Sequence, residues 1–284
     1  GPQHPAFCAR AHRGTGTKGG ALRPYAWYFE PVRWLLLGLA HLPLAVLYVL
    51  AEGIYLLLVY VVRYRWRVVK ENLRNSFPEK PAAEIDRIGK AFYRHFAQVV
   101  VEILKLAAIS PAELAQRMRF TNPELMTRPF AERRLVLSLG SHMGNWEWIL
   151  SGAALEFPGR AAGVYKPLNN PFFESFMRRL RTRLGADAVP MLATLRYLVA
   201  HRNQGHTLSL LTDQAAGPED RPYWTTFLNQ DTSFYTSADR LAVQLDRRLG
   251  EIAPVGLIDG VGDGHHAVDR RLVVAGELGL DHLG

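Results

Sequence analysis

An apolar stretch near the N-terminus, from Trp34 to Val62, constrains this chain more than any other feature. Its only side chains strongly opposed to hydrocarbon are His41 and Glu52. At about 1.5 Å per residue, a helix over the part that follows Pro43 is long enough to cross a bilayer core. A buried helix of a soluble protein usually has a polar stripe, and this stretch has none. The sequence therefore predicts a membrane segment that spans the bilayer or is deeply seated in it.

Two other interpretations of the stretch are weaker. Glu52 at a helix centre costs about 2.5 to 3.5 kcal/mol on membrane insertion, which favours a core helix, but its Leu and Val neighbours offset that cost. A cleaved signal peptide is disfavoured, because the apolar run is too long and no small-residue cleavage site follows it.

Basic residues interleaved with Tyr64 and Trp66 follow the apolar stretch directly. They are Arg63, Arg65, Arg67, Lys70 and Arg74. Because basic residues mark the cytoplasmic side of a membrane segment, the cluster predicts that the larger C-terminal part lies in the cytoplasm. The formal net charge of +8 then points to an anionic membrane surface. Nucleic acid is the weaker alternative and is not an expected partner, since no zinc-finger, RRM or basic-zipper signature is present.

Composition and pattern divide the chain into four parts. With 48% hydrophobic and 21% charged residues, disorder, collagen and coiled coil are excluded for the chain as a whole. The single cysteine, Cys8, excludes an intramolecular disulfide framework and a cysteine-based zinc site. We predict that residues 1–22 are disordered, that residues 23–62 form an N-terminal membrane anchor and that residues 63–246 form an α/β domain. Residues 247–284 are an atypical C-terminal segment, which leaves open whether the domain is complete.

Helical and strand patterns alternate after the basic cluster. Apolar spacing predicts a long helix over Pro81–Ala108. Three short apolar runs predict strands at Leu135–Leu139, Ala161–Tyr165 and Thr207–Leu211. Helices are expected near Asn145–Leu155, Pro171–Leu184 and Leu192–His201. This alternation is typical of βαβ units, so the predicted fold is α/β, with a mixed, largely parallel sheet flanked by helices and an N-terminal membrane helix.

Polar residues follow each predicted strand. His142 follows the first strand, Lys166 the second, and Asp213 and Gln214 the third. Ligands of such sheets bind beyond the carboxyl ends of the strands. We therefore expect these four side chains to converge on one edge of the sheet.

The segment Ser141-His142-Met143-Gly144-Asn145-Trp146-Glu147 is the sharpest local feature. Glu147 lies one helical turn beyond a strand end, where it can bond one imidazole nitrogen of His142, fix its tautomer and strengthen the other nitrogen as a general base. A hydroxyl deprotonated there would attack an acyl carbonyl. From these residues alone, catalysis and a merely structural histidine at a helix start are equally supported.

At this point the sequence resembles the lysophospholipid acyltransferase superfamily and, within it, the lipid A lauroyl/myristoyl acyltransferase branch. The resemblance extends from about Pro31 to Leu245 and rests on ordered blocks after an apolar anchor. These are Asn72-Leu73 with Ser76 to Lys80, Ser141 to Glu147, Val164 to Leu168, Arg181 and Arg183 before Gly185, Asp213-Gln214, and Trp224 to Leu228. The Phe-Pro-Glu-Gly-Thr block of glycerolipid acyltransferases is missing after the histidine motif, which disfavours that branch. Beyond Leu245 we find no match to the strands that usually complete the family's sheet.

The resemblance implies a membrane-bound O-acyltransferase. Such an enzyme moves a fatty acyl group from a thioester of acyl carrier protein or coenzyme A to a lipid hydroxyl, such as that of a lipid A precursor or a lysophospholipid. The implied location is the inner face of the cell inner membrane, with membrane lipids and acyl carrier protein as partners and no cofactor besides the acyl thioester. His142 is then the general base and Glu147 the carboxylate that orients it.

The substrate-binding candidates are less specific. Asn145 belongs to the histidine block. Arg181 or Arg183 would bind an anionic headgroup or stabilise the oxyanion, although both also fit solvated helix charges. Lys166 would bind phosphate or extend along the membrane surface. Asp213 and Gln214 would shape the edge of the sheet, and an acidic residue there is often only a turn former.

Several other functions remain open or are excluded. A thioesterase would use the same histidine to activate water, and a non-catalytic lipid-binding membrane protein is the alternative of another class. A serine hydrolase is disfavoured, because the glycines around Ser141 do not have nucleophile-elbow spacing. His201, His206 and Asp213 have no recognisable ligand spacing, so no metal site is expected.

Overall fold

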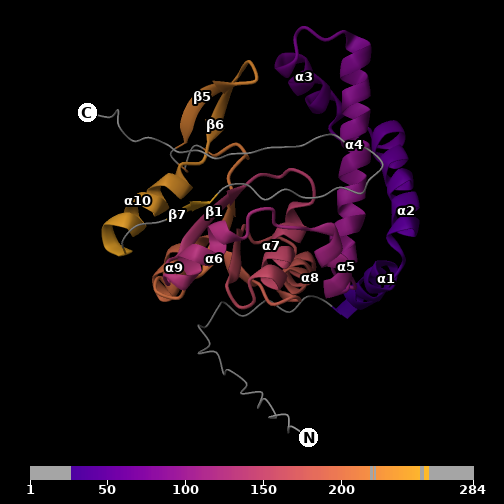
Figure 1. Cartoon of the computed structure of the whole chain (residues 1–284). Helices are drawn as coiled ribbons and strands as arrows, with labels where there is room; N and C mark the ends of the chain where they lie inside the picture. Colours follow the sequence, from indigo (N-terminus) through magenta and orange to yellow (C-terminus); the bar gives the residue numbers. More distant parts are fainter. Residues whose placement is uncertain (1–26, 218–219, 221, 250–252, 256–284) are drawn as a thin grey trace, which may run out of the picture.

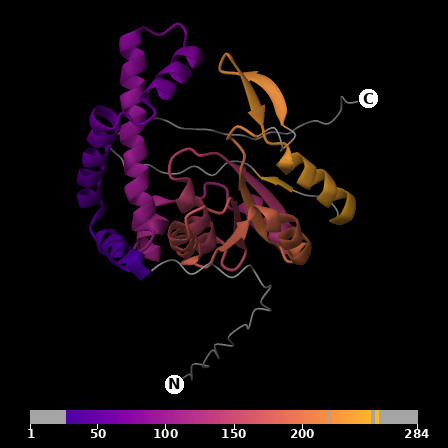
Figure 2. The same ribbon diagram turned by 180° about the vertical axis from the view of Figure 1, so that it is seen from behind.

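The computed structural model describes residues 27–217, 220, 222–249 and 253–255. The prediction of disorder for residues 1–22 lies outside these residues. The helices of residues 30–105 form a layer beside a sheet that is covered by the later helices, and both views of the ribbon show this arrangement (Figures 1 and 2).

The N-terminal layer begins with a 3₁₀ turn (Trp27–Phe29) and helix α1 (Glu30–Ala40). Pro43 separates α1 from α2 (Leu44–Leu56), as expected of a residue that cannot continue a helix. A π-helical turn (Leu57–Val61) extends α2. Among the described residues, Leu44–Val61 is the one helical segment long and apolar enough to cross a membrane, and 28% of it is buried.

The basic cluster extends from the turn before α3 (Trp66–Ser76) to the last turn of that helix, and α4 follows (Ala82–Lys105). The predicted helix over Pro81–Ala108 is thus confirmed. α2 and α4 pack side by side, with α4 between α2 and the rest of the molecule (Figure 1). The short helices α5 (Pro111–Arg117) and α6 (Glu124–Ala131) lead to the sheet.

The sheet has five described strands in the order β3-β2-β4-β1-β7, and all of its pairings are parallel. The strands are β1 (Val136–Gly140), β2 (Ala161–Tyr165), β3 (Asp187–Pro190), β4 (Thr207–Leu211) and β7 (Ala253–Val255). The α/β class with a largely parallel sheet is confirmed. β7 lies in the segment whose pattern seemed atypical, and it pairs with β1 as an edge strand.

Helices alternate with these strands as predicted. They are α7 (Trp146–Glu156), α8 (Pro171–Thr182), a 3₁₀ turn (Met191–Ala193) with α9 (Thr194–His201), and α10 (Ser237–Leu249). An antiparallel hairpin of β5 (Tyr223–Phe227) and β6 (Gln230–Phe234) stands apart from the main sheet. Its turn is tied to the end of α3, where the Asn75 amide donates to Oε1 of Gln230 at 3.2 Å.

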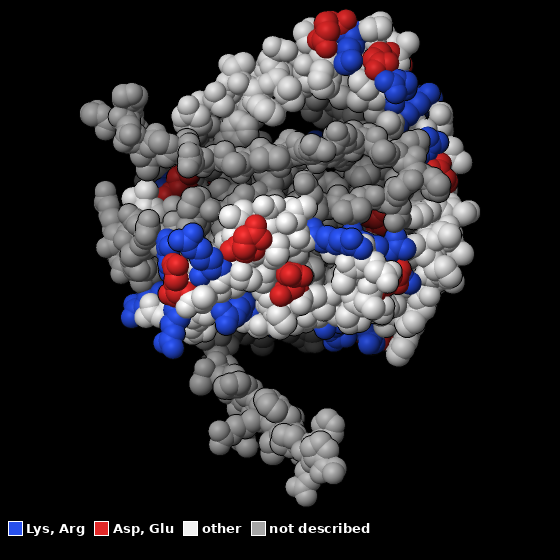
Figure 3. All heavy atoms as spheres, viewed as in Figure 1, with Lys and Arg blue, Asp and Glu red and all other residues white. Residues whose placement is uncertain are grey.

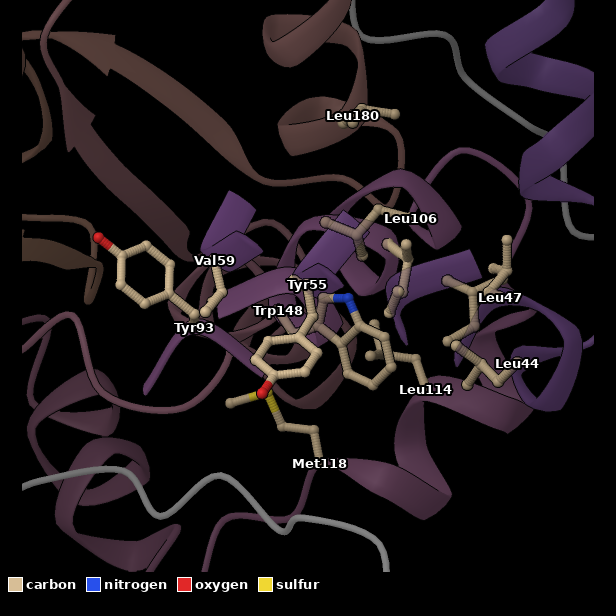
Figure 4. Packing of buried hydrophobic residues seen from close by; sticks show 14 residues of the cluster. Leu44, Leu47, Tyr55, Val59, Tyr93, Leu106, Leu114, Met118, Trp148 and Leu180 are labelled. Atoms are coloured by element: carbon tan, nitrogen blue, oxygen red, sulfur yellow. The ribbon is translucent and has the colours of Figure 1, made fainter. Parts of the chain in front are cut away.

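The largest core cluster joins the N-terminal helices to the α/β part. Leu47 of α2, Tyr93 of α4, Trp148 of α7 and Leu180 of α8 all belong to it (Figure 4). Each such side chain contributes about 1.5 to 3 kcal/mol on burial. The helices that carry the apolar stretch are therefore packed on the domain through α4.

Candidate active site

The register of two adjacent strands brings His142 and Asp213 together. β1 and β4 are parallel neighbours with Gly140 opposite Leu211. His142 lies two residues beyond Gly140, and Asp213 lies two residues beyond Leu211. Both side chains therefore leave the sheet at its carboxyl edge, where ligands of parallel sheets bind.

Asp213 holds His142 through two bonds. Nδ1 of His142 lies 2.7 Å from Oδ1 of Asp213, and the backbone N–H of His142 donates to Oδ2 at 2.8 Å. Because a carboxylate only accepts, we assign the proton of the neutral imidazole to Nδ1, which leaves the lone pair on Nε2. The His142 side chain is 26% exposed, so Nε2 belongs to a group that solutes can reach.

A polar side chain, Gln214, lies beside Nε2 of His142, and an aromatic one, Trp146, lies against the imidazole ring. The Gln214 amide nitrogen lies 3.4 Å from Nε2, a long contact that a substrate hydroxyl can replace. The Trp146 ring meets the imidazole edge-on, with centroids 5.1 Å apart. Gly144 has φ of +58°, a conformation that suits glycine, and it turns the chain between His142 and α7.

A buried ion pair joins α7 to α8. Arg181 donates from Nε to Oε2 of Glu147 at 2.8 Å, and from Nη2 to the other carboxylate oxygen. The side chains are only 14% and 10% exposed. Burial alone would lower the pKa of Arg181, but the bound Glu147 carboxylate, together with Tyr165 and Glu174, more than offsets it, and the pKa is raised above its ordinary value.

This geometry corrects the predicted partner of His142. Glu147 directs both carboxylate oxygens to Arg181, and Asp213 bonds the imidazole Nδ1. The physical reason is that Glu147 occupies the first turn of α7 on its buried face, toward α8. The orienting carboxylate comes from the adjacent strand end and not from the following helix turn.

Asn145 serves the local structure. Its side-chain oxygen caps α7 by accepting from the Trp148 backbone N–H at 3.2 Å, and its amide donates to Glu102 at 2.9 Å. Glu102 also accepts from the Tyr48 hydroxyl at 2.9 Å, so it joins α2 to the loop after His142. The sequence reasoning missed Glu102, although a lone charge within the apolar run of α4 was a usable signal.

The two remaining cationic candidates lie in different settings. Arg183 donates to the backbone carbonyls of Leu106 and Ile109 just beyond the end of α4, so its guanidinium braces that turn. Lys166 is exposed at the end of β2, and β4 separates β2 from β1. Lys166 therefore shares the edge of the sheet with His142 without lying on an adjacent strand.

Aromatic residues near the predicted blocks divide between core and surface. Phe172 is buried and stacks on Phe29 with centroids 5.0 Å apart. Phe173, Trp224 and Phe227 are exposed. Tyr165 lies under the Arg181 guanidinium at 5.0 Å, and burial together with a hydrogen bond to Glu174 raises its pKa to about 12.

Comparison with known proteins identifies the family. A family model described as bacterial lipid A biosynthesis acyltransferase matches residues 21–258. A search of curated proteins found no match. The matched residues include the apolar stretch, the histidine block, the His142–Asp213 and Glu147–Arg181 pairs and strand β7. The chain therefore belongs to the bacterial lipid A biosynthesis acyltransferase family, whose members are acyltransferases.

Proposed function

We propose that this acyltransferase is bound to the cytoplasmic face of the inner membrane. There it transfers a fatty acyl group from a thioester of acyl carrier protein or coenzyme A to a hydroxyl of a lipid acceptor such as a lipid A precursor. The observation that carries the proposal is the His142–Asp213 pair at the carboxyl edge of the sheet. The family match supplies the reaction class, and the pair supplies a base suited to it.

In the proposed reaction, Nε2 of His142 takes the proton of the acceptor hydroxyl as its oxygen attacks the thioester carbonyl carbon. The new C–O bond forms, and the carbonyl oxygen carries the negative charge of the tetrahedral intermediate. That intermediate collapses, the C–S bond breaks, and the imidazolium returns its proton to the departing sulfur. The products are an ester and a free thiol. Asp213 stabilises the imidazolium between the two proton transfers.

Arg181 is proposed to bind an anionic group of the substrate or the oxyanion. Its Nη1 is buried and has no hydrogen-bond partner in the described part of the chain, whereas Nε and Nη2 are bound to Glu147. Glu147 thereby fixes the guanidinium plane and leaves the two N–H groups of Nη1 for a ligand. Gln214 and Lys166 are proposed to contact substrate at the carboxyl edge of the sheet, where His142 lies.

The experiment uses membranes that contain the full chain, its His142→Ala variant or a His95→Ala control from the exposed surface of α4. Radiolabelled acyl thioester is supplied on both carriers, and the lipids are analysed by mass spectrometry. The proposal predicts an acylated lipid with the parent and with His95→Ala, and a loss with His142→Ala. Equal acylation by all three chains removes His142 from the mechanism.

A thioesterase reaction is separated in the same experiment. Release of free fatty acid without an acylated lipid identifies water as the acceptor. If the thioester remains intact with the parent chain, a lipid-binding role replaces the enzymatic one.

A further inference from the structure

Helix α2 with its π-helical turn has two apolar faces, and only one of them is packed in the protein. The residues of its buried face recur at helical spacing and pack against α4. They are Leu44, Leu47, Ala51, Tyr55 and Val59. The opposite face is exposed although it carries no charge. Its residues are Val46, Val49, Leu50, Gly53, Leu56, Leu57, Tyr60 and Val61.

The charge within α2 lies beside these faces and is paired. Glu52 binds Arg94 of α4 at 2.9 Å, so it faces the border with α4. Helix α1 also presents large apolar side chains to solvent, since Trp34 is 64% exposed and Leu35 is 63% exposed. Exposed apolar faces of this kind on a basic protein need an apolar partner.

Polar contacts hold α2 to α4 along its whole length. Before α2 begins, Lys105 donates to the carbonyls of Ala40 and Leu42 at 3.2 and 2.9 Å. In the middle, Tyr48 bonds Glu102 at 2.9 Å. Beyond the π-helical turn, the Tyr93 hydroxyl bonds the Tyr64 carbonyl. The two helices run side by side in both views (Figures 1 and 2).

These contacts bear on whether α2 crosses the bilayer or lies in the membrane plane. If α2 crossed the bilayer as packed, it would carry Lys90, Arg94 and Glu102 of α4 into the hydrocarbon, where ionised side chains are costly. If α2 crossed alone, it would leave Glu52 without Arg94. A helix that lies in the membrane plane avoids both costs, because only its outer face enters the lipid.

We propose that α1 and α2 lie in the plane of the membrane surface, with both ends of α2 on the same side of the bilayer. The outer face of α2 contacts acyl chains, and Arg63, Arg65 and Arg67 contact anionic headgroups. Uncharged residues cover much of the edge of the molecule where α2 lies, whereas basic residues interspersed with acidic ones lie toward α3 (Figure 3).

The arrangement places the lipid-facing helix close to the candidate site. Tyr48 of α2 and Asn145 of the catalytic loop bind the two oxygens of the same Glu102 carboxylate. Only α4 thus separates the lipid-facing helix from the loop that follows His142. The inference rests on the proposed membrane location and specifies how the protein meets the bilayer.

The test begins with a full-length chain in which Cys8 is replaced by Ser and single cysteines are introduced at His41→Cys and Tyr64→Cys, on either side of α2. Sealed membrane vesicles from cells that make the protein are treated with a membrane-impermeant maleimide, before and after permeabilisation. We expect both cysteines to react, or both to be protected, in intact vesicles. Reaction of one cysteine before permeabilisation and of the other only afterwards shows a spanning helix and overturns the proposal.

Depth is measured with a fluorophore on Val46→Cys, Leu50→Cys or Leu57→Cys, one variant at a time, in phosphatidylcholine vesicles with phosphatidylglycerol. An in-plane helix predicts several-fold stronger quenching by shallow than by deep lipid quenchers at all three sites. Val243→Cys on α10 is the exposed control, with little quenching expected. Quenching that is deepest at position 50 or absent at all three sites contradicts the proposal. So does a disulfide-linked dimer of unlabelled Leu50→Cys protein, which would show that a second copy covers this face.

Acyl transfer is assayed in the sealed membrane vesicles from cells that were used for maleimide labelling. Activity together with labels on opposite sides removes the in-plane orientation and leaves the proposed function intact. Same-side labels without lipid acylation support the orientation and count against the acyltransferase reaction.

Discussion

A histidine lies near an acidic residue at both ends of the central strands, the carboxyl edge and the amino edge of the sheet, and the two histidines differ in exposure. At the carboxyl edge, His142 meets Asp213 and remains partly accessible. At the amino edge, His206 is 4% exposed, and its Nε2 bonds the Tyr197 hydroxyl, which donates to Asp187 at 2.8 Å. Burial, with smaller effects of His201 and Arg160 that outweigh Asp187, lowers the pKa of His206 to about 4.

The comparison shows that composition alone does not make a histidine catalytic. Both edges supply imidazole and carboxylate, but the imidazole of His206 is buried against the rings of Tyr197 and His201. A base must accept a proton from a ligand and release it again, and burial that disfavours the charged imidazole opposes this. His206 is therefore a neutral structural group, and His142 is the candidate base.

The largest expected effect comes from exchanging one carboxylate at each edge for an amide. Asp213→Asn removes the group that orients and stabilises the His142 imidazolium, so we expect the rate of lipid acylation to fall by about 10²–10⁴-fold. Asp187→Asn at the other edge should leave the rate within about two-fold. The measurement is initial-rate acyl transfer on purified membranes, with circular dichroism as a folding control. Similar rates for both variants would show that Asp213 has no greater part in acyl transfer than Asp187.

Removing the partner of Arg181 should mainly affect stability. Glu147→Gln leaves a buried guanidinium without its carboxylate, and we expect a loss of about 3–5 kcal/mol in the free energy of unfolding. Replacing both residues with Leu should cost less than the single change, because no charge is then left unpaired. Denaturant unfolding in detergent measures both variants. A greater loss in the double variant than in Glu147→Gln would count against this explanation.

Acidification should lower the free energy of unfolding, because His206 at the amino edge of the sheet is held neutral in the folded protein. The folded-state pKa of His206, about 4, lies below the ordinary value of 6.5, so the unfolded chain binds more protons between these values. Stability is therefore expected to decline as the pH falls from about 6.5 to 4. Thermal unfolding at a series of pH values should show a shallower decline for His206→Phe than for the parent. An unchanged slope in the variant would assign the acid sensitivity to other groups.

The smallest expected effect concerns two helix caps. Asn145→Ala at α7 and Asn170→Ala at α8 each remove a capping side chain, at a cost of about 0.5–2 kcal/mol. Only Asn145 is also tied to Glu102, so we expect a several-fold drop in acyl transfer for Asn145→Ala and none for Asn170→Ala. The two variants are compared by unfolding and by initial rates. Equal rates would limit Asn145 to capping.

Local patterns predicted most of the fold. The apolar runs of β2 and β4 matched their bounds, and the spacing of α4 was sufficient to identify it. β5 was missed because all of its residues are exposed, so it shows no alternation. β7 was missed because it has three residues and its identity as a strand depends on pairing with β1.

The site was predicted in part. The rule for parallel sheets correctly placed His142 and Asp213 at one edge. Their direct bond was not foreseen, since it requires β4 to lie beside β1, and the chain order does not reveal that adjacency. The nearby Glu147 seemed the better partner only because it is close in sequence. The role of Glu102 depends on α4 lying between α2 and α7, which no local pattern encodes.

The adjacency of β1 and β4 also bears on how the protein becomes functional as it is made. His142 and Asp213 are separated by 71 residues, and the units that contain β2 and β3 lie between them in the chain. Their contact therefore closes a long loop, which is a late event when intervening units fold first. A ribosome-bound chain that has not yet completed β4 has no oriented base. The candidate base is therefore expected to be assembled only once β4 has paired with β1.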